Sequence, residues 1–159
     1  MSSGKDVGAD SNVIIRALVV DDLEAVLDIE RQSYSHPWSE AVFRDCFRSD
    51  YRLWAIDRNG IVGYAIVAYL VDEAHLLNLC VAPSYRRQGS AVYLLRQAMI
   101  RARKDGMRQM LLEVRESNEP ARQLYRRAGF STIGRRPDYY PDAGRREAAD
   151  VMALSLITS

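Results

Sequence analysis

Residues 81–91 read Val-Ala-Pro-Ser-Tyr-Arg-Arg-Gln-Gly-Ser-Ala and join an apolar stretch to an amphipathic one. This pattern predicts a strand, a basic turn around Gly89 and then a helix. The first turn of a helix leaves backbone N–H groups unpaired at the positive end of its dipole, which favours a bound phosphate. Arg86 and Arg87 add full positive charges. The segment therefore predicts an anion-binding corner, and a diphosphate cofactor is its first candidate ligand.

Apolar spacing and turn residues predict further elements on both sides of this corner. Before it, they predict strands at 13–20, 51–56, 61–71 and 75–81, and helices from about 21 to 31 and from 40 to 50. After it, they predict helices at 91–104 and 119–128, a strand at 110–114, and a strand pair at 131–136 and 148–156 joined by a loop at 137–147. This order indicates a mixed α/β layout with one central sheet.

Length and charge restrict the class of protein. At 159 residues the chain has the size of one domain, which we predict at 13–157. Lys and Arg total 22 against 21 for Asp and Glu, so the net charge of +1 argues against binding to nucleic acid or to a membrane surface. No stretch approaches the ~20 apolar residues of a membrane span. Residues 1–12 are polar and rich in Gly and Ser, which predicts a disordered lead or a segment derived from expression.

The two cysteines bear on the cellular compartment. Cys46 and Cys80 lie in apolar segments without metal-ligand spacing, which favours buried thiols in a reducing, cytoplasmic setting and no metal. The oligomeric state is left open between a monomer and a weak dimer.

Three segments carry a resemblance to a known family. Residues 79–91 (LCVAPSYRRQGSA), 111–130 (LLEVRESNEPARQLYRRAGF) and 135–141 (RRPDYYP) resemble the GNAT N-acetyltransferases, and among them the RimI-type enzymes that acetylate the N-terminal alanine of a ribosomal protein. The resemblance extends over nearly all of residues 13–157. It implies the GNAT fold, with a central, mostly antiparallel sheet of about six to seven strands and helices on both faces.

Acetyl-CoA is the cosubstrate that this resemblance implies. Arg86, Gly89 and Ala91 match the family's Gln/Arg-x-x-Gly-x-Gly/Ala pyrophosphate motif, and the family holds the pantetheine arm on the backbone of the preceding strand. The predicted cofactor-binding residues are Leu79, Cys80, Val81, Arg86, Arg87, Gln88, Gly89, Ser90, Ala91, Val92, Asn118 and Tyr125. Without the family, the turn could simply carry solvated arginines, and Asn118 could be only a helix cap.

Glu113 and Tyr125 are the predicted catalytic residues. A carboxylate within an apolar strand must form an ion pair, be exposed to solvent or serve in catalysis. Burial would raise the pKa of Glu113 toward that of a general base. The alternative is an ion pair with Arg115 or another arginine. The resemblance implies that Glu113 takes a proton from the acceptor ammonium and that Tyr125 returns one to the leaving thiolate. Tyr125 could otherwise be a packing residue.

The acceptor implied by the resemblance is the N-terminal peptide of a protein, with the alanine of small-subunit ribosomal protein eighteen as the implied case. Trp38, Tyr139 and Tyr140 are the predicted peptide-binding residues, although a packing role for Trp38 and an ordinary loop at the two tyrosines remain open. Transfer would be direct, without an acyl-enzyme. Two alternatives are a small-amine or antibiotic acetyltransferase and a non-catalytic acyl-CoA sensor.

Overall fold

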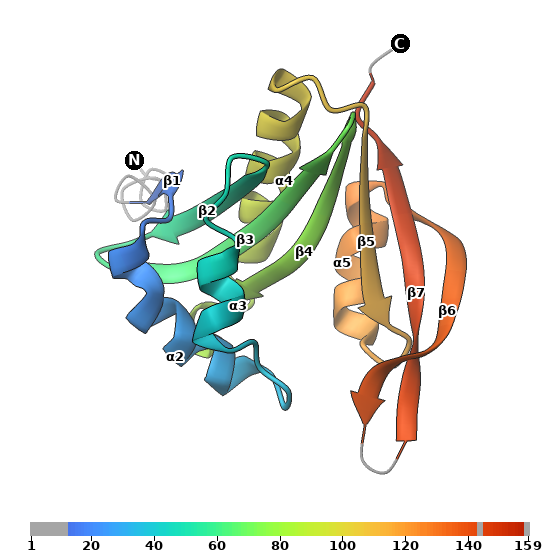
Figure 1. Cartoon of the computed structure of the whole chain (residues 1–159), viewed down its shortest axis with the longest axis horizontal. Coiled ribbons are helices and arrows are strands. Elements are labelled where there is room, and N and C mark those ends of the chain that lie inside the picture. The colour runs from blue at the N-terminus through green and yellow to red at the C-terminus, as the bar shows by residue number, and fades with distance from the viewer. Residues whose placement is uncertain (1–12, 143–144, 158–159) are drawn as a thin grey trace. The chain divides into compact units, whose positions relative to one another are not determined.

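The computed structural model describes residues 13–142 and 145–157 (Figure 1). Its elements in chain order are β1 (Ile14–Ala17), η1 (Val20–Asp22), α2 (Leu23–Ser33), α3 (Glu40–Asp45), β2 (Tyr51–Asp57), β3 (Ile61–Leu70), β4 (Glu73–Val81), η2 (Pro83–Tyr85), α4 (Ser90–Lys104), β5 (Gln109–Arg115), α5 (Glu119–Ala128), β6 (Ser131–Asp142) and β7 (Arg145–Ser155).

The strands form one seven-stranded sheet in the order β1-β2-β3-β4-β5-β7-β6. The pairing of β4 with β5 is parallel, whereas β1–β2, β5–β7 and β6–β7 are antiparallel. The predicted mixed α/β fold with a mostly antiparallel sheet is confirmed.

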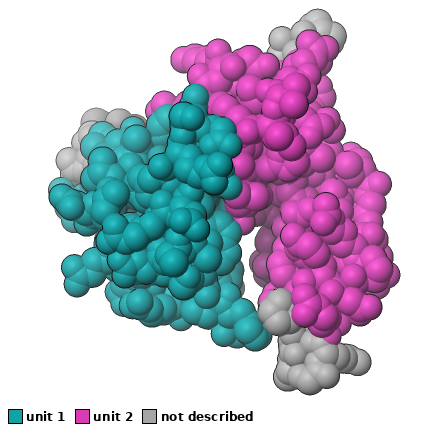
Figure 2. Space-filling model, viewed as in Figure 1, with its two compact units in different colours: residues 1–66, 78–98 teal, residues 67–77, 99–159 magenta. Residues whose placement is uncertain are grey.

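The chain divides into two compact units, which Figure 2 colours separately. Unit 1 comprises Met1–Ile66 and Asn78–Ala98, and unit 2 comprises Val67–Leu77 and Met99–Ser159. The assignment of 13–157 to one domain stays a prediction, and the predicted lead at 1–12 lies outside the described residues. Among the described helices, none has the length and apolar character needed to span a membrane.

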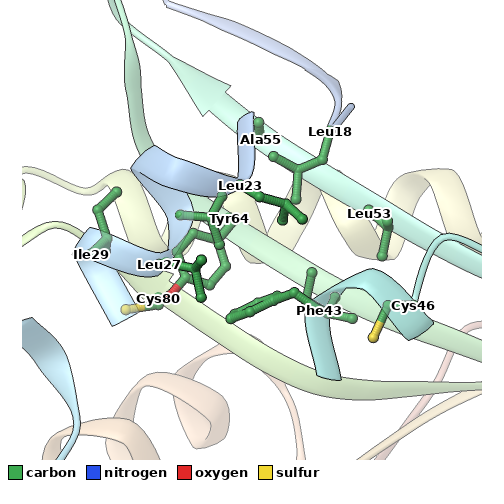
Figure 3. Packing of buried hydrophobic residues seen from close by; sticks show 12 residues of the cluster. Leu18, Leu23, Leu27, Ile29, Phe43, Cys46, Leu53, Ala55, Tyr64 and Cys80 are labelled. Carbon is green, nitrogen blue, oxygen red and sulfur yellow. The ribbon is translucent and has the colours of Figure 1, made fainter. Parts of the chain in front are cut away.

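The main core of unit 1 forms where α2 and α3 pack on strands β2, β3 and β4 (Figure 3). Because side chains alternate along a strand, Leu53, Ala55 and Tyr64 face these helices. Figure 1 shows α4 behind the same strands, so unit 1 has helices on both faces of its part of the sheet. Phe43 of α3 is 1% exposed. Its ring lies 5.1 Å from that of Trp38 and 5.9 Å from that of Tyr64, between centroids.

Arg16 of β1 connects this strand to η1 and to β2 through ion pairs. Its guanidinium donates to both carboxylate oxygens of Asp22, at 2.8 and 3.0 Å, and to Asp57 of β2 at 3.0 Å. The hydrogen bonds from Arg16 lower the pKa of the Asp22 carboxyl. The Gly60 N–H, together with Arg16, lowers the pKa of Asp57. Both carboxylates therefore stabilise the fold in their charged form.

The Arg16→Gln variant is expected to be less stable at pH 7 by about 1 kcal/mol, the usual scale for a partly exposed ion pair. A carboxyl whose pKa is lowered by folding stabilises the protein above its ordinary pKa near 4 and loses that effect as the pH falls through the lowered value. The difference between variant and wild type should therefore shrink below about pH 4. Urea unfolding at pH 7 and at pH 3 measures it; a difference independent of pH would contradict this account.

Strand β5 contributes buried residues to unit 2. It pairs with β7 on one edge and with β4 on the other, over different lengths. Gln109–Arg115 pairs in full with Ala149–Ser155 of β7. The parallel ladder with β4 joins Glu73–Leu76 to Gln109–Leu112. The alternate residues Met110, Leu112 and Val114 of β5 are buried, whereas Glu113 is only half-buried.

The loop predicted at 137–147 is wrong for its described residues, because 137–142 belong to β6 and 145–147 belong to β7. Pairing resumes at Tyr140 with Glu147, after a register shift between Arg136 and Tyr140. Asp138 in the shifted stretch has a positive φ of 57°. Proline at 137 fits because β6 is an edge strand, where a missing N–H need not break the ladder.

Candidate active site

The predicted anion corner lies in unit 1, where β4 leads through η2 into α4. Gly89 has a φ of 79°, a conformation that favours glycine, and a Cβ built there would stand in open space among the described residues. The Tyr93 N–H donates to the Gly89 C=O at 3.0 Å. The amides of Ser90, Ala91 and Val92 therefore precede the first hydrogen-bonded turn of α4, the usual position of anion-binding amides.

The two arginines of the corner differ in their surroundings. Arg86 folds back onto the protein, where it donates to the Val81 C=O at 3.1 Å and to the Ser33 hydroxyl at 2.9 Å. Arg87 is exposed and has a φ of 63°. Arg86 is exposed as well, but its hydrogen bonds connect the turn to β4 and α2. Their contacts with a cofactor stay predictions.

A cavity of about 220 Å³ borders the corner within unit 1. Gly89 and Ser90 line it, together with Tyr93 of α4 and Arg58 of the β2–β3 turn. Arg58 donates to the Gln88 side chain at 3.1 Å, and its guanidinium lies 5.3 Å from the centre of the Tyr85 ring. Gln88 is therefore a link between this turn and the corner.

The second half of β4 holds the residues predicted to bind pantetheine. Cys80 and Val81 are buried, and Leu79 is half-buried. The Leu79 C=O accepts a hydrogen bond from the Tyr34 hydroxyl at 3.1 Å. A Cβ built on Gly63 would lie 2.9 Å from the Cys80 C=O. Glycine at this position lets β3 approach β4 closely.

Glu113 lies on β5 in unit 2 with its side chain 27% exposed, and its carboxylate pairs with Arg136 at 3.3 Å. The ion-pair alternative considered from the sequence is thus seen, with Arg136 as the partner. Arg115 pairs instead with Glu147, also at 3.3 Å.

Tyr139 and Tyr140, from the predicted peptide-binding segment, lie beside Glu113. The Tyr140 hydroxyl donates to the Glu113 backbone C=O at 3.1 Å. The two tyrosine rings meet edge to face at 4.9 Å, and the Arg136 guanidinium lies 5.3 Å from the Tyr139 ring centre. Burial, assisted by Tyr139 and Glu113, raises the pKa of Tyr140 to about 12. Tyr140 therefore stays protonated near neutral pH and donates its hydrogen bond.

The neighbouring turn into α5 is fixed by Glu147 and Asn118. Glu147 accepts the Ser117 N–H at 2.7 Å, and the contacts from Ser117 lower the pKa of this glutamate. Asn118 caps α5 by accepting the Ala121 N–H at 3.3 Å. The cap predicted from the sequence is confirmed, and its contact with a cofactor stays a prediction.

Tyr125, the predicted proton donor, is a buried residue of α5. Its ring meets that of Phe130 at 5.7 Å in an edge-to-face arrangement. The packing role considered from the sequence is present, and the catalytic role stays a prediction. Trp38 in unit 1 is half-buried against Phe43, so it also packs on the core.

Sequence reasoning assigned no site role to Glu30, Tyr34, Asn78 or Arg136, although Arg136 lies in the matched segment that contains Tyr139 and Tyr140. Glu30 follows the helical spacing of Leu23, Val26 and Leu27, but nothing local reveals which groups pair with its carboxylate. The signal that could have found it is a charged residue on the apolar stripe of a helix. In the described part of the chain, no group of three or more His, Cys, Asp or Glu side chains could hold a metal ion.

Comparison with known proteins decides the family. Residues 23–130 match the acetyltransferase (GNAT) family. The chain belongs to this family. As a GNAT protein it is an acyltransferase, and the predicted acetyl-CoA-dependent N-acetyltransferase is confirmed.

Individual GNAT relatives cover nearly the whole chain. The chain is 37% identical to the ribosomal protein bS18-alanine N-acetyltransferase of Escherichia coli strain K12 over 143 residues, which cover 89% of this chain and 97% of that protein. The enzyme of the same name from Haemophilus influenzae is also 37% identical, over 90% of this chain and 99% of that protein. The crystal structure of the Escherichia coli enzyme superposes with a TM-score of 0.87, at 36% identity and over 92% and 96% of the two chains.

Proposed function

We propose that this protein transfers the acetyl group of acetyl-CoA directly to the N-terminal amine of a protein, and that its acceptor is the N-terminal alanine of ribosomal protein bS18. The main support for this proposal is a sequence similarity to enzymes that are named for that acceptor. The similarity extends over about nine-tenths of the chain. With a ribosomal acceptor, the enzyme would act in the cytoplasm.

The corner of unit 1 fits the diphosphate of acetyl-CoA. The amides of Ser90–Val92 and the open space at Gly89 allow the backbone to approach a phosphate, and Arg87 adds an accessible charge. The backbone of Leu79, Cys80 and Val81 would hold the pantetheine arm, and Asn118 would contribute a hydrogen bond. When bound, acetyl-CoA supplies an activated acetyl group.

Glu113 would accept a proton from the acceptor ammonium, directly or through water. A free α-amine has a pKa near 8, so about a tenth is already neutral at pH 7, whereas lysine near 10.4 is almost fully charged. One carboxylate is therefore a sufficient base for an N-terminal amine. The Arg136 contact and the Tyr140 bond to the Glu113 backbone support this role because they hold the strand and the side chain in place.

Tyr125 would return a proton to the leaving thiolate. A phenol with an ordinary pKa near 10 protonates a thiolate of pKa near 8.5 only if it is held close, so its position matters more than its acidity. Packing against Phe130 restricts the ring of Tyr125, which supports a fixed position. For the peptide, Tyr139 and Tyr140 offer aromatic and polar surface beside Glu113, and Trp38 would contribute a further contact.

Mass spectrometry after incubation with acetyl-CoA tests this function. The acceptors are peptides that begin with Ala, Ser, Met and Lys, together with polyamines and aminoglycosides. We expect acetylation at the α-amine, with the bS18 N-terminal peptide as the best acceptor. Acetylation of a polyamine or aminoglycoside alone would indicate a small-amine enzyme instead. Tight acetyl-CoA binding without any product would indicate a sensor.

A further inference from the structure

Glu30 is a buried carboxylate in unit 1 that joins three segments. It lies on α2, is 1% exposed, and accepts three hydrogen bonds. Its Oε1 accepts from the Tyr64 hydroxyl of β3 at 2.6 Å and from the Asn78 amide of β4 at 3.0 Å. Its Oε2 accepts from the backbone N–H of Trp38 at 3.0 Å. The carboxylate thus fixes the loop between α2 and α3 relative to two strands.

The network continues from Asn78 to the part of β4 assigned to the cofactor. The Asn78 Oδ1 lies 3.4 Å from the Tyr34 hydroxyl, and the same hydroxyl donates to the Leu79 C=O at 3.1 Å. Tyr34 and Trp38 both belong to the α2–α3 loop, here defined as residues 34–39. The loop is therefore attached at one end to Leu79 and at the other to Glu30.

The energetics favour a positioning role over a simple stabilising one. The three groups that donate to Glu30 are neutral, so they offset only part of the several kcal/mol that burying a charge costs. An apolar side chain of similar volume would fill the same place without that cost. What the carboxylate adds is a fixed contact, because its Oε2 accepts the Trp38 backbone N–H in the observed arrangement of the loop.

We propose that Glu30 is a positioning residue for the acceptor peptide: it holds loop 34–39, with Trp38, in the conformation that binds the protein N-terminus. The inference rests on the proposed function, because Trp38 is assigned to the acceptor there. Glu30 itself acts through the backbone of Trp38 and does not take part in the chemistry.

The Glu30→Gln variant tests the contact with Trp38 separately from the contacts with Tyr64 and Asn78. Glutamine keeps one oxygen, and if that oxygen stays with Tyr64 and Asn78, its NH₂ group faces the Trp38 N–H, donor against donor. Because the unpaired Trp38 donor destabilises this arrangement of the loop, we expect the KM for the Ala-peptide to rise about tenfold. The kcat should change less than about threefold and the Kd for coenzyme A less than about twofold, as for a change confined to acceptor binding.

Three further variants control this result. Tyr64→Phe removes a donor from Oε1 but leaves the Trp38 contact, so it should lower the melting temperature while the KM for the peptide stays near the wild-type value. Glu40→Gln is an exposed substitution at the start of α3 that should change neither. Should Glu30→Gln fail to fold, Tyr34→Phe removes the other attachment of the loop and should raise the same KM about fivefold, which corresponds to the loss of one hydrogen bond worth about 1 kcal/mol.

The outcomes separate this inference from the proposed function. Acetylation of the Ala-peptide by the wild type, combined with an unchanged KM in Glu30→Gln, would overturn the positioning role alone. An equal rise in KM for Glu30→Gln and Tyr64→Phe would also overturn it, since both would then act by loosening the core. If Glu30→Gln does not fold, an unchanged KM in Tyr34→Phe has the same meaning. A wild type that leaves every peptide unmodified would remove the proposed function and this inference with it.

Discussion

The Glu113→Gln variant is expected to turn over the Ala-peptide at least about tenfold more slowly, a threshold set below the roughly 10²–10⁴-fold that a general base contributes. Glutamine has nearly the shape of glutamate and can still contact Arg136, but it cannot accept a proton from the acceptor. The coenzyme A affinity should stay near that of the wild type, because no coenzyme contact is assigned to Glu113. Steady-state kinetics and calorimetry with coenzyme A measure the two quantities.

A matched control and the pH dependence sharpen this experiment. Glu24→Gln makes the same chemical change on an exposed turn of α2 and should leave turnover unaltered. The variant at Glu113 should also lose the dependence of turnover on an ionising base. If its pH–rate profile matches that of the wild type, the assignment of Glu113 is rejected.

The Phe43→Ala variant is expected to lose about 3–5 kcal/mol of unfolding free energy, the usual cost of deleting a buried phenyl ring. Phe43 is almost fully buried beside Tyr64 (Figure 3). Its ring also packs against that of Trp38. Removing it leaves a cavity beneath loop 34–39. We therefore expect a large fall in the urea midpoint with an unchanged m-value, since the surface exposed on unfolding is nearly the same.

Two companion variants identify the cause of that loss. Phe43→Leu keeps most of the volume and should cost far less than the alanine variant. Val42→Ala removes methyl groups from the next residue, which is 42% exposed, and should change the unfolding free energy by about 0.5 kcal/mol or less. Equal losses at positions 42 and 43 would contradict the packing account.

The features that the sequence predicts well are set by local chemistry. The β2–β3 hairpin follows from Asn59-Gly60, and both residues have positive φ values, 60° and 128°. The corner before α4 and the cap at Asn118 are likewise local, because a glycine conformation and a side-chain cap need only neighbouring residues. These elements therefore lie close to their predicted positions.

The features that sequence reasoning misses depend on distant residues. Glu30 is satisfied by Tyr64 and Asn78, which lie 34 and 48 positions away, and no local pattern encodes that meeting. Glu113 pairs with Arg136 on β6 rather than with the nearby Arg115. Arg86 likewise turns to Ser33, 53 positions earlier in the chain. Partner identity in each case follows from the tertiary packing of elements that are distant in the sequence.

The extension of β6 into the predicted loop shows a similar limit. Pro137 and the turn-forming residues around it indicate an irregular connection, whereas pairing with β7 carries the strand onward. The edge position of β6 makes this possible, because an edge strand pairs on one side only and the ladder with β7 passes Pro137 through a register shift.

That same proline lies on a strand whose outer side has no partner among the described strands of the sheet. An exposed strand with an unbroken row of N–H and C=O groups recruits the corresponding strand of another molecule and nucleates aggregates. The backbone of β6 has no N–H at Pro137, and the left-handed Asp138 and two register shifts make the strand irregular. The outer border of the sheet is therefore an irregular template for pairing with the strand of another molecule.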